Sequence, residues 1–545
     1  MTGGTLKNNI GKILSKFTSL VKKVDIDADN SYFASKVKPV NEKIRKKIAE
    51  AKRKISRIFS ESRTLKLLKR LRISLLRTSM RSYGIALLLF GLYSAAISVM
   101  RHYITDKSYL DASLLTGLIC VVVAILFLTS SKTLVELLCE SSTASKLIET
   151  VFCLRPDDIL NMKRKIRSAN IAVIIGSLCG LLTFFVEPQK IIYYGFMLLL
   201  GAILIFSPEF GINALVLLLP FLNESKISLL IFAFYAAYIL KYIRGKRIFS
   251  FGASEMLPAI IGIIGVIRVL INLKGSPISL VFAVCIPLLY LAVQNMFRTR
   301  KLSFALADTL GISFFLVYGV RILCSLASYA GYDFTVASSI GDISAIGEYA
   351  VLCVGFALFL ISRTEVFLRK LLLCTVVSFS VTVMLASGNY KLAICALIAA
   401  LVYIIASRQK SMIIAFPYIA IIPIAYLLSA KLEPVKAFIS IFTQSENAVS
   451  FLNASDFMYV FGFGGFAIML IFFIISISKR LAVRCGNDGE RRSLYAATYS
   501  FVCGMISYFL LCGIKLRFVS LVLVIIAVAL SSALSGSYVK EKENG

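Results

Sequence analysis

The chain has 545 residues, of which 58% are hydrophobic and 16% are charged, and its mean hydropathy is +0.84. Soluble domains average about 45–50% apolar and about 25% charged residues, so this composition excludes a soluble enzyme, a disordered protein and a secreted disulfide scaffold. The net charge is +31, and in a membrane protein such a surplus reports orientation rather than nucleic-acid binding.

Residues 1–82 form a basic segment that we predict to lie in the cytoplasm. They contain 22 basic and 6 acidic residues, a net charge of +16. Between residues 41 and 81 the pattern becomes that of a basic amphipathic helix, with apolar residues at spacings of 4, 7 and 4 from Ile44 to Phe59. Such a helix binds an anionic leaflet. The alternative is a solvated tail whose charge only fixes topology.

Residues 83–534 are predicted to form a polytopic, all-α membrane domain, followed by a cytoplasmic tail at 535–545. A membrane-crossing helix needs about 20 apolar residues. Runs near that length occur at 83–100, 113–130, 169–186, 190–206, 226–243, 256–272, 278–297, 303–326, 345–362, 367–386, 390–406, 411–430, 456–478, 494–512 and 515–534, with a shorter run at 209–222. We therefore predict fourteen to sixteen transmembrane helices.

Positive charge sets the orientation of these spans. With the N-terminal segment inside and every run crossing, the strongly basic loops all face inward: 163–167, 241–247, 298–301, 363–370, 408–410 and 479–492. The outward loops are short or nearly neutral: 101–112, 187–190, 223–225, 273–277, 327–344, 387–389 and 431–455. Because Lys and Arg concentrate on the cytoplasmic side, we predict a multi-pass cell-membrane protein with both termini in the cytoplasm.

Ionisable residues within spans are costly and tend to mark sites. Arg268, Arg321 and Lys391 lie toward the outward ends of their spans. Arginine offers planar, bidentate donors to phosphate and lysine adds a point charge, so these three predict a diphosphate site at the outer face. Snorkelling of each side chain to the headgroups is the alternative. Glu348 and Asp456, on the same side, are candidates for orienting an acceptor hydroxyl.

The chain has one histidine, His102, which excludes a zinc site built on several imidazoles. A P-loop motif is also missing, which excludes that class of ATPase. The 12 cysteines include no CxxC pair, and most lie in apolar runs, where we expect small buried hydrophobic residues. We predict no metal, no cofactor and no nucleic-acid partner.

Residues 169–478 resemble the O-antigen ligase and polymerase family. The resemblance rests on hydropathy and on five stretches: 206–211 (FSPEFG), 217–221 (LLLPF), 385–393 (LASGNYKLA), 453–459 (NASDFMY) and 462–465 (GFGG). It implies a GT-C-like fold and the handling of polyprenyl-diphosphate-linked saccharides at the outer face of the cytoplasmic membrane. Expected partners are the bilayer, a lipid-linked saccharide and other envelope-assembly proteins.

The sequence departs from the family pattern at two functional positions. The arginine of the family's Ser-Arg-Gly step is missing, with Lys391 as a displaced candidate, and the outward segment 431–455 contains no histidine. Three functions therefore stay open: a membrane glycosyltransferase or ligase, a transporter or flippase of a lipid-linked or anionic solute, and a non-catalytic scaffold of polysaccharide assembly.

Overall fold

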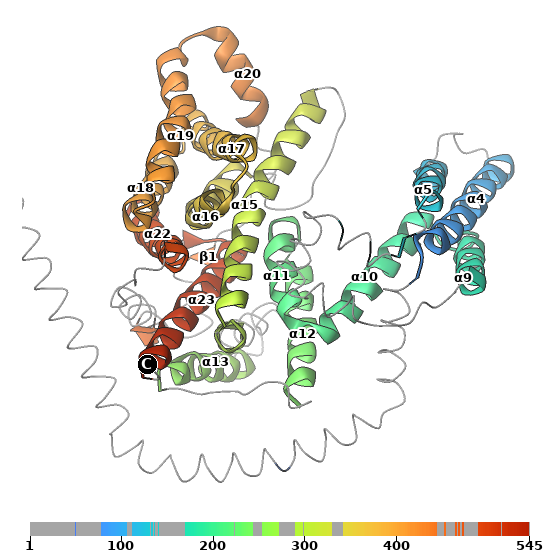
Figure 1. The fold of residues 1–545 in the computed structure, drawn as a ribbon, viewed down its shortest axis with the longest axis horizontal. Coiled ribbons are helices and arrows are strands. Elements are labelled where there is room, and N and C mark those ends of the chain that lie inside the picture. The colour runs from blue at the N-terminus through green and yellow to red at the C-terminus, as the bar shows by residue number, and fades with distance from the viewer. Residues whose placement is uncertain are drawn as a thin grey trace, which may run out of the picture. The chain divides into compact units, whose positions relative to one another are not determined.

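The computed structural model describes residues 78–105, 112–130, 132–133, 169–222, 224–243, 253–271, 289–297, 299–329, 342–443, 489–513 and 515–543, with residues 50, 136, 140, 452–453, 464–465, 467–468 and 471–472. Over these residues the chain is almost wholly helical (Figure 1). The only sheet among them pairs β1 (Leu452–Asn453) with β2 (Lys515–Leu516) in antiparallel register. The predicted all-α class is confirmed.

The helices begin and end close to the predicted spans. Their bounds are α4 (Met80–Thr105), α5 (Ala112–Leu128), α9 (Ala169–Leu182), α10 (Pro188–Phe206), α11 (Pro208–Leu218), α12 (Glu224–Ile243), α13 (Ala253–Ile271), α15 (Arg300–Tyr329), α16 (Ile343–Arg363), α17 (Phe367–Ala386), α18 (Tyr390–Ser407), α19 (Lys410–Ser429), α20 (Glu433–Thr443), α22 (Gly489–Cys512) and α23 (Phe518–Glu543). A 3-10 turn, η1 (Leu219–Phe221), follows α11.

The chain is a polytopic membrane protein. Among the described residues, six helices are long and apolar enough to cross a membrane, and six shorter apolar helices accompany them. The predicted spans at 278–297 and 456–478 fall mainly outside the described residues, so the total of fourteen to sixteen stays a prediction. The proposed amphipathic helix at 41–81 also lies almost entirely outside them.

The described residues divide into two compact units, with the divisions falling inside α11 and α12. In one unit, α4 packs against α5 and α9. A Cβ placed on Gly176 of α9 would lie 2.6 Å from the Ala86 carbonyl oxygen of α4, so these two helices meet backbone to backbone. Many large apolar side chains on α5 and α9 are exposed, as a lipid-facing surface requires.

In the other unit, α16 is the central helix. It packs against α15, α17, α18, α22 and α23, and nearly all of its residues are buried. Small residues allow this close packing. A Cβ on Gly311 of α15 would lie 2.6 Å from the Phe356 carbonyl oxygen, and one on Gly355 would lie 2.6 Å from Cβ of Ser500 on α22. Small residues at contacts let membrane helices approach closely.

The segment 431–455, which was predicted to face outward, contains a helix that the hydropathy pattern did not predict. This helix, α20, packs against α15 and α17. Val435, Ile439 and Phe442 follow a spacing of four and three and so share one face, on which Ile439 and Phe442 are buried, while Lys436 and Ser440 are exposed. α20 is therefore an amphipathic helix lying on the ends of two spans.

Polar contacts at helix ends join residues that were predicted to lie at the same face of the membrane. Arg101, after the first span, donates to the carbonyl oxygens of Thr183 (3.1 Å) and Phe184 (2.6 Å) at the end of α9. Arg492 donates from Nε to the Ala406 carbonyl oxygen at 3.3 Å. Each contact joins residues that the charge pattern places at one membrane face. Which face is cytoplasmic stays a prediction.

Candidate functional site: two buried arginines beside the start of helix α16

Arg321 lines a small pocket formed by α15, α16, α17 and α20, here called the Arg321 pocket. The residue is only 8% exposed, and its Nη2 atom donates to the Phe442 carbonyl oxygen of α20 at 3.4 Å. Apart from Arg321 and Tyr318, the lining is apolar: Ile322, Ile343, Ile346, Phe379, Val383, Met384 and Phe442. A guanidinium thus sits at the wall of a mainly apolar pocket.

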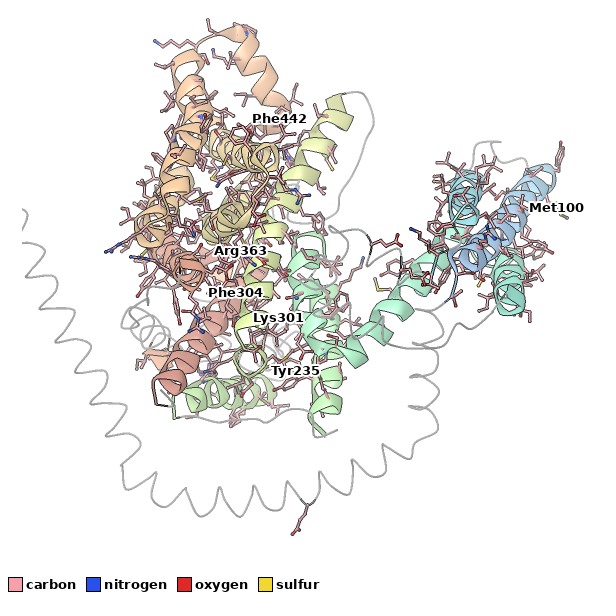
Figure 2. All side chains as sticks on the ribbon, in the orientation of Figure 1. Met100, Tyr235, Lys301, Phe304, Arg363 and Phe442 are labelled. Carbon is pink, nitrogen blue, oxygen red and sulfur yellow. The ribbon has the colours of Figure 1, made fainter. Side chains whose placement is uncertain are left out.

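The position of Arg321 along α15 is compatible with the prediction that this residue lies near one membrane face. Arg321 follows the first residue of the helix, Arg300, by 21 positions, a rise of about 31 Å at about 1.5 Å per residue. The hydrocarbon core is about 30 Å thick. The ring of Phe442 packs edge-on against Phe379 of α17, with centroids 5.0 Å apart, and so holds α20 over the pocket. Figure 2 labels Phe442 at this position.

The other two predicted cations have different surroundings. Arg268, on α13, and Lys391, the second residue of α18, are both exposed, and neither is among the residues that line the Arg321 pocket. Lys391 interacts electrostatically with Cys512 at the end of α22. Of the three, Arg321 is the buried cation. The other two have the exposure that snorkelling side chains need.

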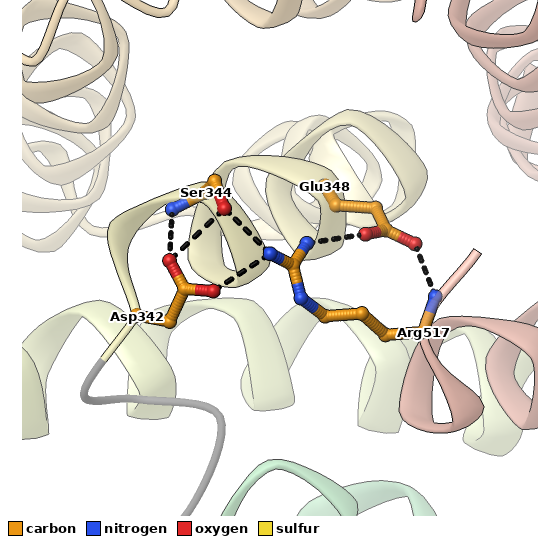
Figure 3. A network of polar contacts seen from close by, with 4 residues as sticks. All are labelled: Asp342, Ser344, Glu348 and Arg517. Carbon is orange, nitrogen blue, oxygen red and sulfur yellow. Dashed lines mark hydrogen bonds and ion pairs between the residues drawn. The ribbon is translucent and has the colours of Figure 1, made fainter. Parts of the chain in front are cut away.

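Glu348, a predicted acceptor-orienting residue, is instead part of a buried ion-pair network, the Arg517 network, made of Asp342, Ser344, Glu348 and Arg517 (Figure 3). Arg517 donates from Nη1 to Glu348 Oε2 at 2.8 Å and from Nη2 to Asp342 Oδ2 at 2.6 Å. Its backbone N–H donates to Glu348 Oε1 at 3.2 Å. Both Glu348 and Arg517 are almost fully buried. Both oxygens of the Glu348 carboxylate are therefore hydrogen-bonded to Arg517, the residue that directly precedes α23.

Asp342 also caps α16. Its Oδ1 atom accepts hydrogen bonds from the Ser344 backbone N–H and hydroxyl, both at 2.9 Å. A side-chain acceptor at this position satisfies N–H groups that have no partner within the helix. The same carboxylate thus starts the central helix and holds Arg517, which joins the first turns of α16 and α23.

A second small pocket adjoins this network and includes Arg517 in its lining, together with Tyr349 and Ser520. Ile346 of α16 lines both pockets. Two buried arginines therefore lie on either side of the first turns of the central helix, one held by two carboxylates and one at the wall of an apolar pocket.

Arg517 was not predicted from the sequence as a site residue. It lies within the apolar run 515–534 that was counted as a span, close to its outward end. The sequence feature that could have revealed it is the short stretch Lys515-Leu516-Arg517 between two spans. This stretch lies at the predicted outward end of the spans, where the other candidate cations were identified. Asp456, the second predicted acceptor residue, lies outside the described residues.

A third ion pair lies nearer the opposite end of α15. Arg363, at the end of α16, donates to Asp308 Oδ2 at 2.5 Å and lies over the rings of Phe304 and Phe359, at 5.2 and 5.6 Å from their centroids. Figure 2 labels Arg363 beside Phe304. Asp308 precedes Arg321 by 13 residues, about 20 Å along the helix. Asp308 therefore lies toward the opposite end of α15 from Arg321, about 12 Å from the first residue of the helix.

Within the described part of the chain, no group of three His, Cys, Asp or Glu side chains could hold a metal ion. No family model matches the chain, and searches of the curated proteins and of the solved structures give no match.

Proposed function

We propose that this protein handles polyprenyl-diphosphate-linked saccharides at the outer face of the membrane, in the manner of the O-antigen ligases and polymerases, and that Arg321 binds the diphosphate. The observation that carries the proposal is the buried guanidinium at the wall of the Arg321 pocket. Ionisable residues buried among membrane helices are rare, and they commonly serve ligand or ion binding.

The chemistry of the pocket suits a ligand that is both anionic and apolar. The Arg321 guanidinium offers donors in a planar fork that matches phosphate oxygens, and the aliphatic and aromatic lining suits the first part of a lipid chain. Its enclosed space is only about 10 Å³, so side chains at the pocket wall must move to admit a diphosphate. The pocket therefore suits the head of such a lipid, with the saccharide and most of the lipid chain outside it.

A second candidate function is binding without catalysis. Transfer of a glycosyl group to an acceptor needs a residue that orients the attacking hydroxyl of the acceptor. Glu348 was the candidate for this role, but both of its carboxylate oxygens already accept hydrogen bonds from Arg517. This arrangement favours a scaffold that holds a lipid-linked saccharide for other envelope-assembly proteins. If the protein is an enzyme, loss of ligand binding at Arg321 also abolishes glycan transfer by this chain. If it is a scaffold, the chain itself catalyses no transfer.

Direct binding tests the proposal. The purified full-length protein is titrated with farnesyl diphosphate, a short polyprenyl diphosphate, and Arg321→Gln, Arg321→Lys and Arg369→Gln are compared with the wild type. Arg369 is the matched control because it is exposed on α17. Removing a charge-assisted donor costs about 1.5–3 kcal/mol, so Arg321→Gln should weaken binding about 10- to 150-fold.

Arg321→Lys separates recognition from snorkelling. A lysine cannot reproduce the bidentate fork, so it too should bind the diphosphate more weakly, whereas snorkelling predicts near-normal behaviour. Unchanged affinity in folded Arg321→Gln protein would refute the proposed site. Lost binding together with unchanged glycan length and transfer in cells would favour the scaffold over the enzyme.

A further inference from the structure

The end of helix α20 contacts the side chain that we assign to the diphosphate, Arg321. Phe442 is the last residue but one of α20, and its carbonyl oxygen accepts a hydrogen bond from Arg321 Nη2 at 3.4 Å. The last four carbonyl groups of a helix have no partner within the helix, and they carry the negative end of its dipole. Arg321 therefore caps α20 through a donor that a phosphate oxygen would also use.

With α20 in this position the Arg321 pocket is closed. Its enclosed space of about 10 Å³ is about that of a single water molecule. Phe442 forms part of the wall, and it belongs to a buried apolar cluster with Ile343 and Val383, against which Phe379 packs. The other lining residues belong to the long helices α15, α16 and α17. A diphosphate can enter only if one of these wall elements moves.

Helix α20 is the wall element that moves at the lowest cost. It has 11 residues, against 30 in α15, 21 in α16 and 20 in α17. Isolated helices shorter than about 12–15 residues are marginal in water, so α20 depends on its docked face, where Ile439 and Phe442 are buried. An amphipathic helix can also lie in the membrane interface. An undocked α20 can therefore keep its apolar side chains out of water.

We propose that α20 is a lid that closes the Arg321 pocket, and that a diphosphate opens it by replacing the Phe442 carbonyl group on Arg321. This inference rests on the proposed binding of a lipid diphosphate at Arg321. Phosphate oxygens carry a full charge and accept two guanidinium donors side by side, at about 2.7–2.9 Å. The Phe442 carbonyl oxygen accepts from Nη2 at 3.4 Å. The exchange of the carbonyl for the phosphate therefore strengthens the contacts of Arg321.

A lid that competes with the ligand lowers the apparent affinity, because only the open fraction of the protein can bind. Weakening the docking of α20 should therefore tighten binding, whereas damage to a purely structural helix should leave binding unchanged or weaken it. Ile439 allows this test because it is buried on the docked face of α20 but does not line the pocket. Ser440, exposed on the same helix, provides the matched control.

The first measurement is the affinity of the purified full-length protein for farnesyl diphosphate. We expect Ile439→Ser to bind about fivefold more tightly than the wild type, or more tightly still. Ser440→Ala should bind like the wild type, and Arg321→Gln should bind more weakly.

The second measurement is the rate at which a maleimide labels Ile439→Cys, followed by mass spectrometry of the peptide that contains residue 439. Farnesyl diphosphate should raise this rate about fivefold or more, because it increases the open fraction. Farnesol, which lacks the diphosphate, should not raise it. Ser440→Cys is the matched control, and it should react at the same rate with and without farnesyl diphosphate.

The outcomes separate the lid from the binding site. If Ile439→Ser binds no more tightly than the wild type while Arg321→Gln binds more weakly, the lid is overturned and the proposed function stands. An unchanged labelling rate at position 439 in ligand-saturated protein would overturn the lid in the same way. Absence of binding in every variant would overturn both the lid and the diphosphate site. Binding detected in Ile439→Ser alone would support the lid, because the wild-type pocket would then stay closed at the concentrations used.

Discussion

Replacing Arg517 by glutamine tests whether the Arg517 network holds the central helix to α23. The side chain is 2% exposed, as against 1% for Glu348 and 10% for Asp342. Arg517→Gln removes the positive charge and leaves two carboxylates close together with little access to water. Their mutual repulsion and their lost hydrogen bonds then both act against the folded state.

The expected cost follows from these contacts. Removing one partner of a buried ion pair costs about 3–5 kcal/mol, because the remaining charge stays buried without compensation. Glu348→Gln should cost less, about 1–3 kcal/mol, since Arg517 keeps Asp342 at 2.6 Å and the new amide oxygen still accepts a hydrogen bond. The double variant Arg517→Gln/Glu348→Gln should be less destabilised than the sum of the two single changes, by about 1 kcal/mol or more.

Unfolding in mixed micelles, titrated with SDS, measures these differences on the full-length protein. Lys436→Gln is the matched control, because Lys436 pairs with Glu433 at 3.0 Å on an exposed surface. Such pairs contribute about 0–1 kcal/mol. If Arg517→Gln unfolds at the same SDS fraction as Lys436→Gln, the network does not stabilise the fold and the reasoning fails. Strictly additive single and double changes would show that the two residues do not interact.

Three further predictions concern packing, topology and the N-terminal segment. Gly311→Ala should destabilise by about 1–3 kcal/mol because its Cβ would lie 2.6 Å from a carbonyl oxygen of α16, whereas Gly319→Ala, with nothing within 4 Å, should be neutral or stabilising in the same unfolding assay. A cysteine at Ser440, exposed on α20, should react with an impermeant maleimide from outside, and one at Lys246 should not; the reverse pattern would invert the threading. A peptide of residues 41–81 should bind anionic vesicles and dissociate as salt increases, and absence of binding at low salt would leave that segment with a role in topology only.

The helices of the membrane domain could be predicted because two independent signals agree. Apolar length predicted where spans such as 303–326 and 345–362 lie, and alternating loop charge predicted an orientation for them, which stays a prediction. Helix α20 escaped prediction because its eleven residues are too few and too polar for a hydropathy run. The spacing of Val435, Ile439 and Phe442 was the available signal.

The candidate site was less predictable, because its partners are distant in sequence. Arg321 could be found as a charge inside an apolar run, but its pocket depends on Phe442, 121 residues later. Glu348 could be found in the same way, whereas its partner Arg517 is 169 residues away and was hidden in a run counted as a span. A single sequence shows which charges are costly to bury, but not which of them lie together.

The distribution of charge along the central helix bears on the choice between binding and transport. α16 spans 21 residues, about 30 Å at about 1.5 Å per residue, and is charged only near its ends, with Glu348 held by Arg517 and Arg363 paired to Asp308. The residues between them, 349–362, include no charge, and the 12 residues of α15 between Asp308 and Arg321 include none either. A route for an anionic or proton-coupled solute is typically marked by ionisable groups at intermediate depth. On these two helices only Asp308, about 12 Å from the start of α15, lies at such a depth, and it is paired with Arg363. The uncharged stretches beyond it favour recognition of a ligand at one face over its passage through the bundle.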